Sequence, residues 1–436
     1  MILCRHKAAE GKNVMKTYYI DPVMGNNNNS GLSEALPLQD EKSINLQPGD
    51  TVLFKRGSFV RRKLNNKSGS NGKPITYGAY GEGEKPVFCG SVDLADAGLW
   101  QEEGKNIWVC DAVKGDEAGN FIFDASYGTL RWTKEELREQ GDFYDECFGY
   151  SSKRQSIPEK HKIYLYSEGN PASVYKSIEC ATFGARNLAD NGNDMIIENL
   201  KFINSGVHAI AGEGKSRNFA VHNCDFDNIG GCVWNNDLKI RFGNGVEMWD
   251  IAENVEVTGC YFYNIYDSAV THQGMENCEP ANRLIFNNNI FIKCGMAAYE
   301  QRDRLPLYAE FNNNICVDAG EGFSKQGEVM PRSSEIWPQP MGHHVFLWRI
   351  ENPTPGGVLE MKNNIFYNAP YGAAIYSIIS EEAEKQIVLE DNTYYTENQD
   401  LINRFFGKDY KTFEEYSECE KSAKYEKVDI KRLISK

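Results

Sequence analysis

The sequence predicts an all-β protein in which a single strand of chain winds through stacked coils, a parallel β-helix. Two observations carry this prediction. One strand-and-turn pattern recurs seven times, and an asparagine recurs at the same place within it. A β-sandwich is the alternative, but sandwiches place turns every 8–12 residues without such a column. A β-helix coil buries its face only against neighbouring coils, which explains a repeat.

The seven repeats align on their final residue, which is aromatic in six of them. Successive positions are separated by 24, 36, 29, 25, 50 and 28 residues. A minimum near 24 with longer intervals predicts coils that are constant in their strands and variable in their loops. The column consists of Phe202, Phe226, Phe262, Phe291, Cys316, Phe366 and Tyr394.

Asparagine stands three places before this column in five repeats, and Gly259 and Asp391 take its place in the other two. All three residue types tolerate a left-handed backbone, and asparagine can also bond to the next coil. The pattern therefore predicts a tight turn between two strands of each coil. The asparagines are Asn199, Asn223, Asn288, Asn313 and Asn363.

The rest of the chain is organised around these coils. We predict a disordered leader over residues 1–15, the β-helix over 16–400 and an insertion over about 92–172. Within the insertion, Thr133–Gly141 has the pattern of a capped helix. Residues 401–436 are charged and have helical spacing. They are predicted to form a helical cap, because a bare last coil exposes unpaired strand edges.

Composition limits the partners and the location. The formal net charge of −15 argues against nucleic acid, which needs clusters of Lys and Arg. No segment has the pattern of a secretion signal or of a membrane-spanning helix, so no membrane partner is expected. The 12 cysteines form no CxxC pair and are expected to be reduced thiols of a cytoplasmic protein. Oligomeric state is not predicted.

The N-terminal third carries a resemblance to a known family. The segments Tyr18–Gly31, Pro48–Phe59 and Pro74–Ser91 resemble the opening of right-handed parallel β-helix proteins of the pectate-lyase-like superfamily. Gly141–Glu146 and Ile163–Ser173 resemble a strand-rich insertion in a bacterial, carbohydrate-active subset. The resemblance implies a right-handed coil from about Tyr18 to Asn398. That superfamily contains glycoside hydrolases, polysaccharide lyases, epimerases and phage tail proteins, so the fold does not select an activity.

A second strand of each coil supplies the candidate active site. Six segments align so that Ile210, Val246, Val270, Tyr299, Phe323 and Ile375 share an apolar column. Side chains alternate along a strand, so the next column is expected to face outward. That column contains Ala211, Glu247, Thr271, Glu300, Ser324 and Tyr376.

The predicted catalytic residues are Glu247, Asp267 and Glu300. Glu247 and Glu300 are two coils apart in this register, so their backbones are expected about 9–10 Å apart. Asp267 lies one coil from Glu247, near a turn. Carboxylates about 5 Å apart suit retaining glycosidases, and about 6.5–9.5 Å suits inverting ones. Each also has an ordinary interpretation: a solvated carboxylate, a turn-capping Asp, or a Glu paired with a nearby Arg.

Substrate-binding residues are predicted from their places beside this groove. Imidazoles, indoles and long polar side chains can hold sugar hydroxyls or stack on sugar rings, although each can equally serve packing or the surface. No cofactor is predicted, nor any metal site, because the adjacent His343 and His344 face opposite ways on a strand. The predicted binding residues are His208, Arg241, Trp249, Tyr266, Thr271, His272, Gln273, Lys325 and Trp337.

Three functions remain open on the sequence. A glycoside hydrolase acting on oligosaccharides is favoured, because the groove column carries acids. A polysaccharide lyase would use Lys325 or Arg241 next to a uronate, with Asp clusters available for calcium. A non-catalytic glycan-binding β-helix would need only aromatic side chains.

Overall fold

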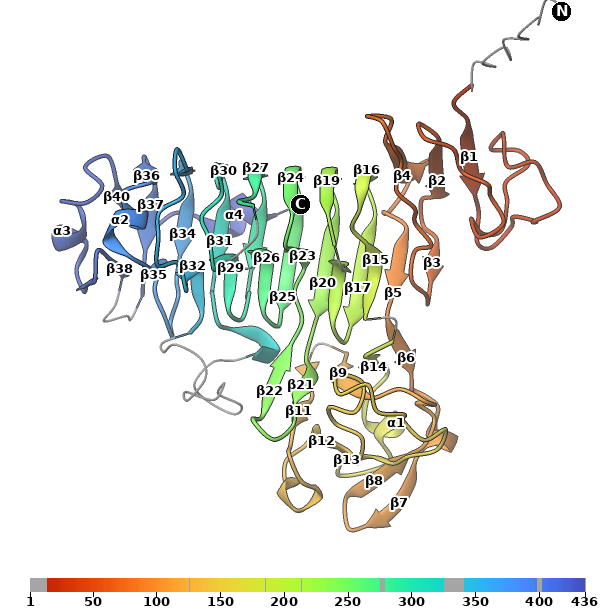
Figure 1. The fold of residues 1–436 in the computed structure, drawn as a ribbon. Coiled ribbons are helices and arrows are strands. Elements are labelled where there is room, and N and C mark those ends of the chain that lie inside the picture. Colours follow the sequence, from red (N-terminus) through yellow and green to blue (C-terminus); the bar gives the residue numbers. More distant parts are fainter. Residues whose placement is uncertain are drawn as a thin grey trace, which may run out of the picture.

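In the computed structural model the chain forms a right-handed parallel β-helix, seen as a row of stacked coils in Figure 1. The structure describes residues 14–124, 126–184, 186–212, 214–274, 279–324, 341–397 and 402–435. Three long sheets run the length of the row, and the neighbouring strands in them are parallel except at the C-terminal end of the third sheet. A typical coil passes from the first sheet to the second and then to the third, as in β16, β17 and β18.

The strands of the three sheets have the following bounds. The first sheet contains β1 (Thr17–Ile20), β2 (Thr51–Lys55), β4 (Ile75–Tyr80), β16 (Asn193–Glu198), β19 (Ser216–His222), β24 (Ala252–Thr258), β27 (Asn282–Asn287), β30 (Tyr308–Glu310), β33 (Val358–Lys362) and β36 (Ile387–Glu390). The second contains β3 (Phe59–Val60), β5 (Val87–Cys89), β17 (Lys201–Ser205), β20 (Asp225–Ile229), β25 (Tyr261–Ile265), β28 (Ile290–Ile292), β31 (Ile315–Val317), β34 (Ile365–Tyr367), β37 (Thr393–Tyr395) and β40 (Lys424–Tyr425). The third contains β15 (Asn187–Asp190), β18 (His208–Ala211), β23 (Val246–Trp249), β26 (Ser268–Gln273), β29 (Ala297–Arg302), β32 (His343–Trp348), β35 (Ile375–Ile378), β38 (Asn403–Phe405) and β39 (Lys408–Tyr410).

The predicted aromatic column is confirmed residue by residue in the second sheet. Phe202 pairs with Phe226, Phe226 with Phe262, and Phe262 with Phe291, and the register continues to Tyr394. The first four rings stack face to face, with centroids 4.5–5.6 Å apart. All are buried, so the column forms the centre of the solenoid core.

The left-handed turn is also confirmed. Asn199, Asn223 and Asn288 have φ of 56°, 50° and 59°, and Gly259 and Asp391 have 65° and 57°. Only residues that tolerate this region fit here, which explains why Gly and Asp replace Asn in two repeats.

A buried asparagine ladder, which the repeat pattern did not predict, lies one residue beyond this turn. Asn314 Nδ2 donates to the Phe286 carbonyl at 2.8 Å, and Asn314 Oδ1 accepts from the Asn289 backbone N–H at 2.9 Å. Asn364 and Asn392 repeat the pattern in the next two coils. These side chains satisfy buried backbone groups at the corner of each coil, where no strand partner is available.

Replacing Asn314 with Ala is expected to lower the free energy of unfolding by about 2–5 kcal/mol, because it leaves two buried backbone groups without partners. Asn313→Gly is the matched control. Asn313 is exposed, with φ of 57°, so its change is expected to stay within about 1 kcal/mol. Urea denaturation of both variants checks this, and equal losses would contradict a specific role for the ladder.

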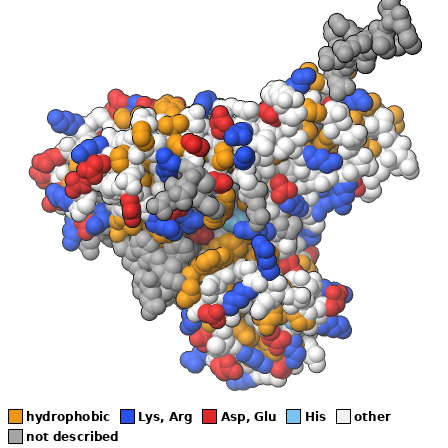
Figure 2. Space-filling view, in the orientation of Figure 1, with side chains coloured by type: hydrophobic (Ala, Val, Ile, Leu, Met, Phe, Trp, Pro, Cys, Tyr) orange, Lys and Arg blue, Asp and Glu red, His pale blue; other side chains and the backbone are white. Residues whose placement is uncertain are grey.

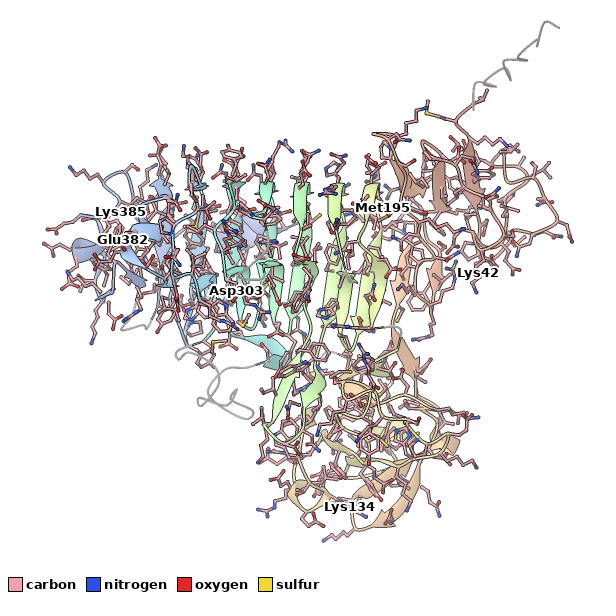
Figure 3. All side chains as sticks on the ribbon, in the orientation of Figure 1. Lys42, Lys134, Met195, Asp303, Glu382 and Lys385 are labelled. Atoms are coloured by element: carbon pink, nitrogen blue, oxygen red, sulfur yellow. The ribbon has the colours of Figure 1, made fainter. Side chains whose placement is uncertain are left out.

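The insertion hangs below the row of coils and has two sheets and a hydrophobic core of its own (Figure 1). Lys134 lies at its end farthest from the coils (Figure 3). The expected helix at Thr133–Gly141 is a single 3₁₀ turn, η2 (Lys134–Glu136), capped by Glu136, whose carboxylate accepts from the Thr133 N–H at 3.2 Å. The remaining elements are β6 (Ser91–Asp93), η1 (Ala97–Leu99), β7 (Gln101–Gly104), β8 (Ile107–Cys110), β9 (Ala118–Phe123), β10 (Ser126–Tyr127), β11 (Thr129–Leu130), β12 (Asp142–Asp145), β13 (Ile163–Tyr166), α1 (Pro171–Val174) and β14 (Ile178–Thr182).

The C-terminal end covers the last coils with short elements. Glu420 Oε1 ends the asparagine ladder by accepting from Asn392 N at 2.9 Å, and buried Tyr416 packs edge-on against Tyr394. The helices there are shorter than the sequence predicts, with β38–β40 between them: α2 (Glu381–Glu384), α3 (Phe413–Tyr416) and α4 (Ile430–Ile434). Among the described residues no helix is long and apolar enough to span a membrane. The cytoplasmic location stays a prediction, and most of the expected leader lies outside the described residues.

Candidate active site

The outward column of the third sheet has the predicted register around Glu247. Glu247 pairs with Thr271, and Thr271 pairs with Glu300. One assignment in this column is wrong, because Gly322–Ser324 is a 3₁₀ turn, η3. The strand next to β29 in the third sheet is β32, and its Phe346 pairs with Glu300. Phe323 instead stacks on Tyr266, with ring centroids 5.8 Å apart. Phe323 therefore packs against another aromatic ring and does not occupy the apolar strand column in which the sequence placed it.

A cavity of about 1280 Å³ opens on this face of the coils. Figure 2 shows a hollow between the coils and the insertion, where apolar side chains and a histidine come to the surface. One wall is the hairpin of β21 (Cys232–Asn235) and β22 (Ile240–Phe242), which accounts for the long 36-residue interval. The floor is a column of β-helix residues that lies two places beyond the predicted outward column: Trp249, Gln273, Arg302, Trp348 and Ile378.

Glu247 lies in this cavity, and its carboxylate is held by three side chains. Asn244 Nδ2 donates to Oε2 at 2.7 Å, His208 Nδ1 lies 2.9 Å from the same oxygen, and Trp249 Nε1 donates to Oε1. Burial raises the pKa of Glu247, but the charge and hydrogen bond of His208, with Asn244 and Trp249, outweigh it and lower the pKa to about 2. Glu247 is thus an ionised carboxylate at neutral pH.

His208 has two possible partners for one nitrogen. The Asn244 backbone N–H also points at Nδ1, at 3.1 Å. A ring that carries a proton on Nδ1 donates to Glu247, whereas the other tautomer accepts from Asn244.

Asp267 lines the same cavity from the turn before β26. Its Oδ2 accepts from the Gly243 N–H at 3.1 Å, and its own N–H donates to the Gly243 carbonyl at 3.0 Å. Gly243 has φ of 142°, and a Cβ there would lie 2.2 Å from the Gly230 Cα. Gly230 and Gly243 flank the β21–β22 hairpin of one coil, and glycine at both positions lets the two ends of the hairpin meet closely, with Gly243 against Asp267 of the next coil.

Glu300 has the predicted place on the strand but does not line the cavity. Its carboxylate accepts from Thr271 Oγ1 at 2.9 Å, Ser268 Oγ at 3.1 Å and Trp348 Nε1 at 2.8 Å, and none of its surface is exposed. Burial raises the pKa of Glu300 above its ordinary value in spite of these donors. The expected Glu247–Glu300 pair is therefore not supported, because Trp348 from the next coil covers Glu300.

Thr271 and His272 are also buried away from the cavity. His272 occupies the inward column, where Nε2 donates to the Asp250 carbonyl at 2.9 Å and Nδ1 accepts from Gln301 at 2.9 Å. Burial lowers its pKa, so the ring is neutral. The alternation that points Thr271 outward points His272 into the core, and we do not propose a substrate contact for either residue.

The structure brings Arg241, Gln273 and Trp249 to the cavity, with Tyr266 directly behind. Arg241 donates to the carbonyls of Gly231 at 2.6 Å and Gly119 at 3.0 Å, and its guanidinium stacks 4.6 Å above the Tyr266 ring. Arg241 is therefore a fixed cation on the hairpin wall. Lys325 and Trp337 lie outside the described residues.

Several cavity residues were not found from the sequence. Arg302 lies between two indoles, 5.6 Å from the Trp249 ring and 5.7 Å from the Trp348 ring. Arg302 and Trp348 share the outward column of Trp249 and Gln273, so extending that column along the third sheet would have predicted both. The hairpin residues, such as Trp234, and the loop residue Arg186 carry no repeat signal, because they lie outside the coils.

The pKa of Glu247 predicts a pH-dependent stability. A carboxyl whose pKa falls from 4.5 to about 2 on folding contributes stability above pH 4.5 and loses it as the pH falls towards 2. The difference in unfolding free energy between wild type and Glu247→Gln is expected to shrink by about 2 kcal/mol from roughly pH 5 to pH 3. Urea denaturation at several pH values checks this, and a constant difference would contradict the pairing.

No family model matches the chain. It is 26% identical over 215 residues, 47% of its length, to a lacto-N-biosidase of Bifidobacterium longum subsp. longum, and the match spans 12% of that relative. The solved structure of XylC in complex with xylose superposes with a TM-score of 0.54 at 14% identity, covering 89% of this chain and 63% of XylC. A GH136 lacto-N-biosidase from Eubacterium ramulus gives a TM-score of 0.47 at 14% identity, covering 95% and 68%.

The likeness to XylC shows the fold alone at this identity. It agrees with the three parallel sheets of this chain. The chain is therefore a right-handed parallel β-helix.

Proposed function

We propose that the protein is a carbohydrate-active enzyme, a glycoside hydrolase that cleaves oligosaccharides in the cavity around Glu247. The observation that carries this proposal is an ionised, buried carboxylate in an aromatic-lined cavity that also contains a second acid, Asp267. Glycoside hydrolysis uses such a pair, one acid to protonate the leaving oxygen and one carboxylate to attack or to activate water.

The environment of Glu247 supports the roles that we propose for the two acids. Glu247 is held ionised by His208, Asn244 and Trp249, so it serves as the nucleophile or base. Asp267 is then the proton donor, because Glu300, the other candidate, has no exposed surface.

The size and lining of the cavity fit a saccharide. Its volume of about 1280 Å³ exceeds the range of roughly 300–1,000 Å³ that is usual for small-molecule sites. Trp234, Trp249 and Trp348 offer indole surface to sugar rings, and Arg186 and Gln273 offer polar groups. The local similarity to a lacto-N-biosidase supports the same substrate class.

A polysaccharide lyase is the alternative, and of Lys325 and Arg241, the two residues predicted to serve it, Arg241 lies among the described residues. Two backbone carbonyls and the Tyr266 ring hold Arg241 in place, which suits an anchoring cation better than a proton acceptor.

The test is a panel of aryl glycosides, neutral oligosaccharides and uronate-containing glycans, incubated with the purified chain. We expect new reducing ends from at least one neutral substrate and no ultraviolet absorbance from an unsaturated uronate. That absorbance would identify a lyase, and binding without any cleavage would identify a glycan-binding protein.

A further inference from the structure

A buried Asp–Cys–His group in the insertion lies outside the cavity. One ligand atom each from Asp145, Cys147 and His161 lies within 4.8 Å of the other two, and this is the only such group in the part of the chain that the structure describes. The side chains of Asp145 and His161 are 0% and 2% exposed, and Cys147 is 3% exposed. A carboxylate, a thiol and an imidazole are ligands of zinc.

The histidine is aimed into this group, where Asp145 is its nearest charged neighbour. His161 Nε2 lies 3.3 Å from Asp145 Oδ1, yet neither ring nitrogen makes a hydrogen bond of normal geometry. The Pro158 carbonyl lies close to the ring, also without normal geometry. An unsatisfied buried imidazole is costly, and a bound cation on Nε2 would satisfy it.

The carboxylate is already oriented as metal ligands usually are. Asp145 Oδ2 accepts from the Ala118 N–H at 2.8 Å, and Oδ1 accepts from the Cys147 N–H at 2.8 Å. Each oxygen keeps a lone pair, and such outer hydrogen bonds fix ligating carboxylates in place. Glu117 has no exposed surface and an Oε1 that lacks a partner, but it does not belong to the group whose ligand atoms lie within 4.8 Å of one another.

We propose that Asp145, Cys147 and His161 bind a zinc ion that closes the base of the loop between β12 and β13. Asp145 ends β12, His161 lies two residues before β13, and the two strands pair antiparallel. The ion therefore joins both ends of a long connection. The sequence did not point to these three ligands, because they form no CxxC pair and the hairpin pairing that brings them together is not visible in their spacing.

The loop contacts the wall of the cavity. Ser152 Oγ donates to the Val233 carbonyl at 2.9 Å, and Lys153 pairs with Asp237 at 2.9 Å. Val233 lies in the hairpin that carries Arg241 into the cavity. The zinc ion thus stabilises the loop that contacts the β21–β22 hairpin, and it takes no part in the proposed glycoside hydrolysis.

The test is zinc content, which does not depend on any glycosidase activity. The full chain is purified without a polyhistidine tag or chelator, supplied with one equivalent of zinc, dialysed and analysed by mass spectrometry of the metal. We expect about one zinc per chain, and a loss of most of it in Cys147→Ala and His161→Ala. Cys110→Ala, a buried thiol in the same insertion, and His222→Ala are the matched controls and keep it.

A second measurement remains decisive if the variants fail to fold. Cobalt substituted into the wild-type chain and the Cys110→Ala control is expected to show thiolate-to-metal charge-transfer absorption, and the melting temperature is expected to rise with zinc. A wild-type chain that holds no zinc and shows neither effect would overturn the proposal, as would Cys147→Ala with wild-type zinc content.

Discussion

Glu247→Gln is expected to lower kcat on a hydrolysable glycoside by about 10²–10⁴, because Gln keeps the shape of the side chain and removes the charge. The substrate still meets the same cavity, so KM is expected to change little. Steady-state kinetics on the best substrate of the panel checks this. The loss applies to every leaving group, since an ionised carboxylate acts on the sugar and not on the departing oxygen.

Glu351→Gln is the matched control for this variant. Glu351 is an exposed carboxylate on the rim of the same cavity, and removing its charge is expected to leave turnover near the wild-type value. Wild-type turnover in Glu247→Gln, with the fold intact by circular dichroism, would remove Glu247 from the mechanism.

Asp267→Asn is expected to lower kcat by about 10²–10⁴ on a substrate whose leaving group is a sugar, because a sugar alkoxide needs a proton as it departs. The side chain also accepts the Gly243 N–H, and Asn keeps that acceptor. The melting temperature is therefore expected to change little. In the pH profile of the wild type, the limb at high pH reports loss of the proton from the acid, and it is expected to disappear in the variant.

Unchanged turnover and an unchanged high-pH limb in Asp267→Asn would rule out Asp267 as the proton donor. A large fall in melting temperature would instead assign the residue to the contact that it makes with Gly243 of the preceding coil.

The fold was predictable because its signals are local and repeated. The turn asparagine needs a left-handed backbone and the following aromatic residue needs the core, so each coil repeats both, and the register from Phe202 to Tyr394 is the predicted one. The buried ladder of Asn289 and Asn314 was missed, since adjacent asparagines look alike in sequence and only one of each pair turns inward.

The site was predictable only where the strand pattern determines it. Glu247 was found from its column, whereas the burial of Glu300 depends on Trp348, which belongs to a coil displaced by a long excursion. The walls of the cavity come from segments outside the coils, where Trp234 follows no repeat. Contacts between segments that are distant in sequence fix the positions of these wall residues, so the spacing of residues along the chain does not predict them.

The most direct test of the roles of Glu247 and Asp267 compares two substrates that contain the same sugar. One substrate has a sugar as its leaving group, and the other has a dinitrophenyl group, which departs without a proton. For Glu247→Gln, kcat is expected to fall by about 10²–10⁴ on both. For Asp267→Asn, it is expected to fall as much on the first substrate and by no more than ~10-fold on the second. Wild-type turnover of both substrates by both variants, or the reverse dependence on the leaving group, would contradict the roles assigned to this pair.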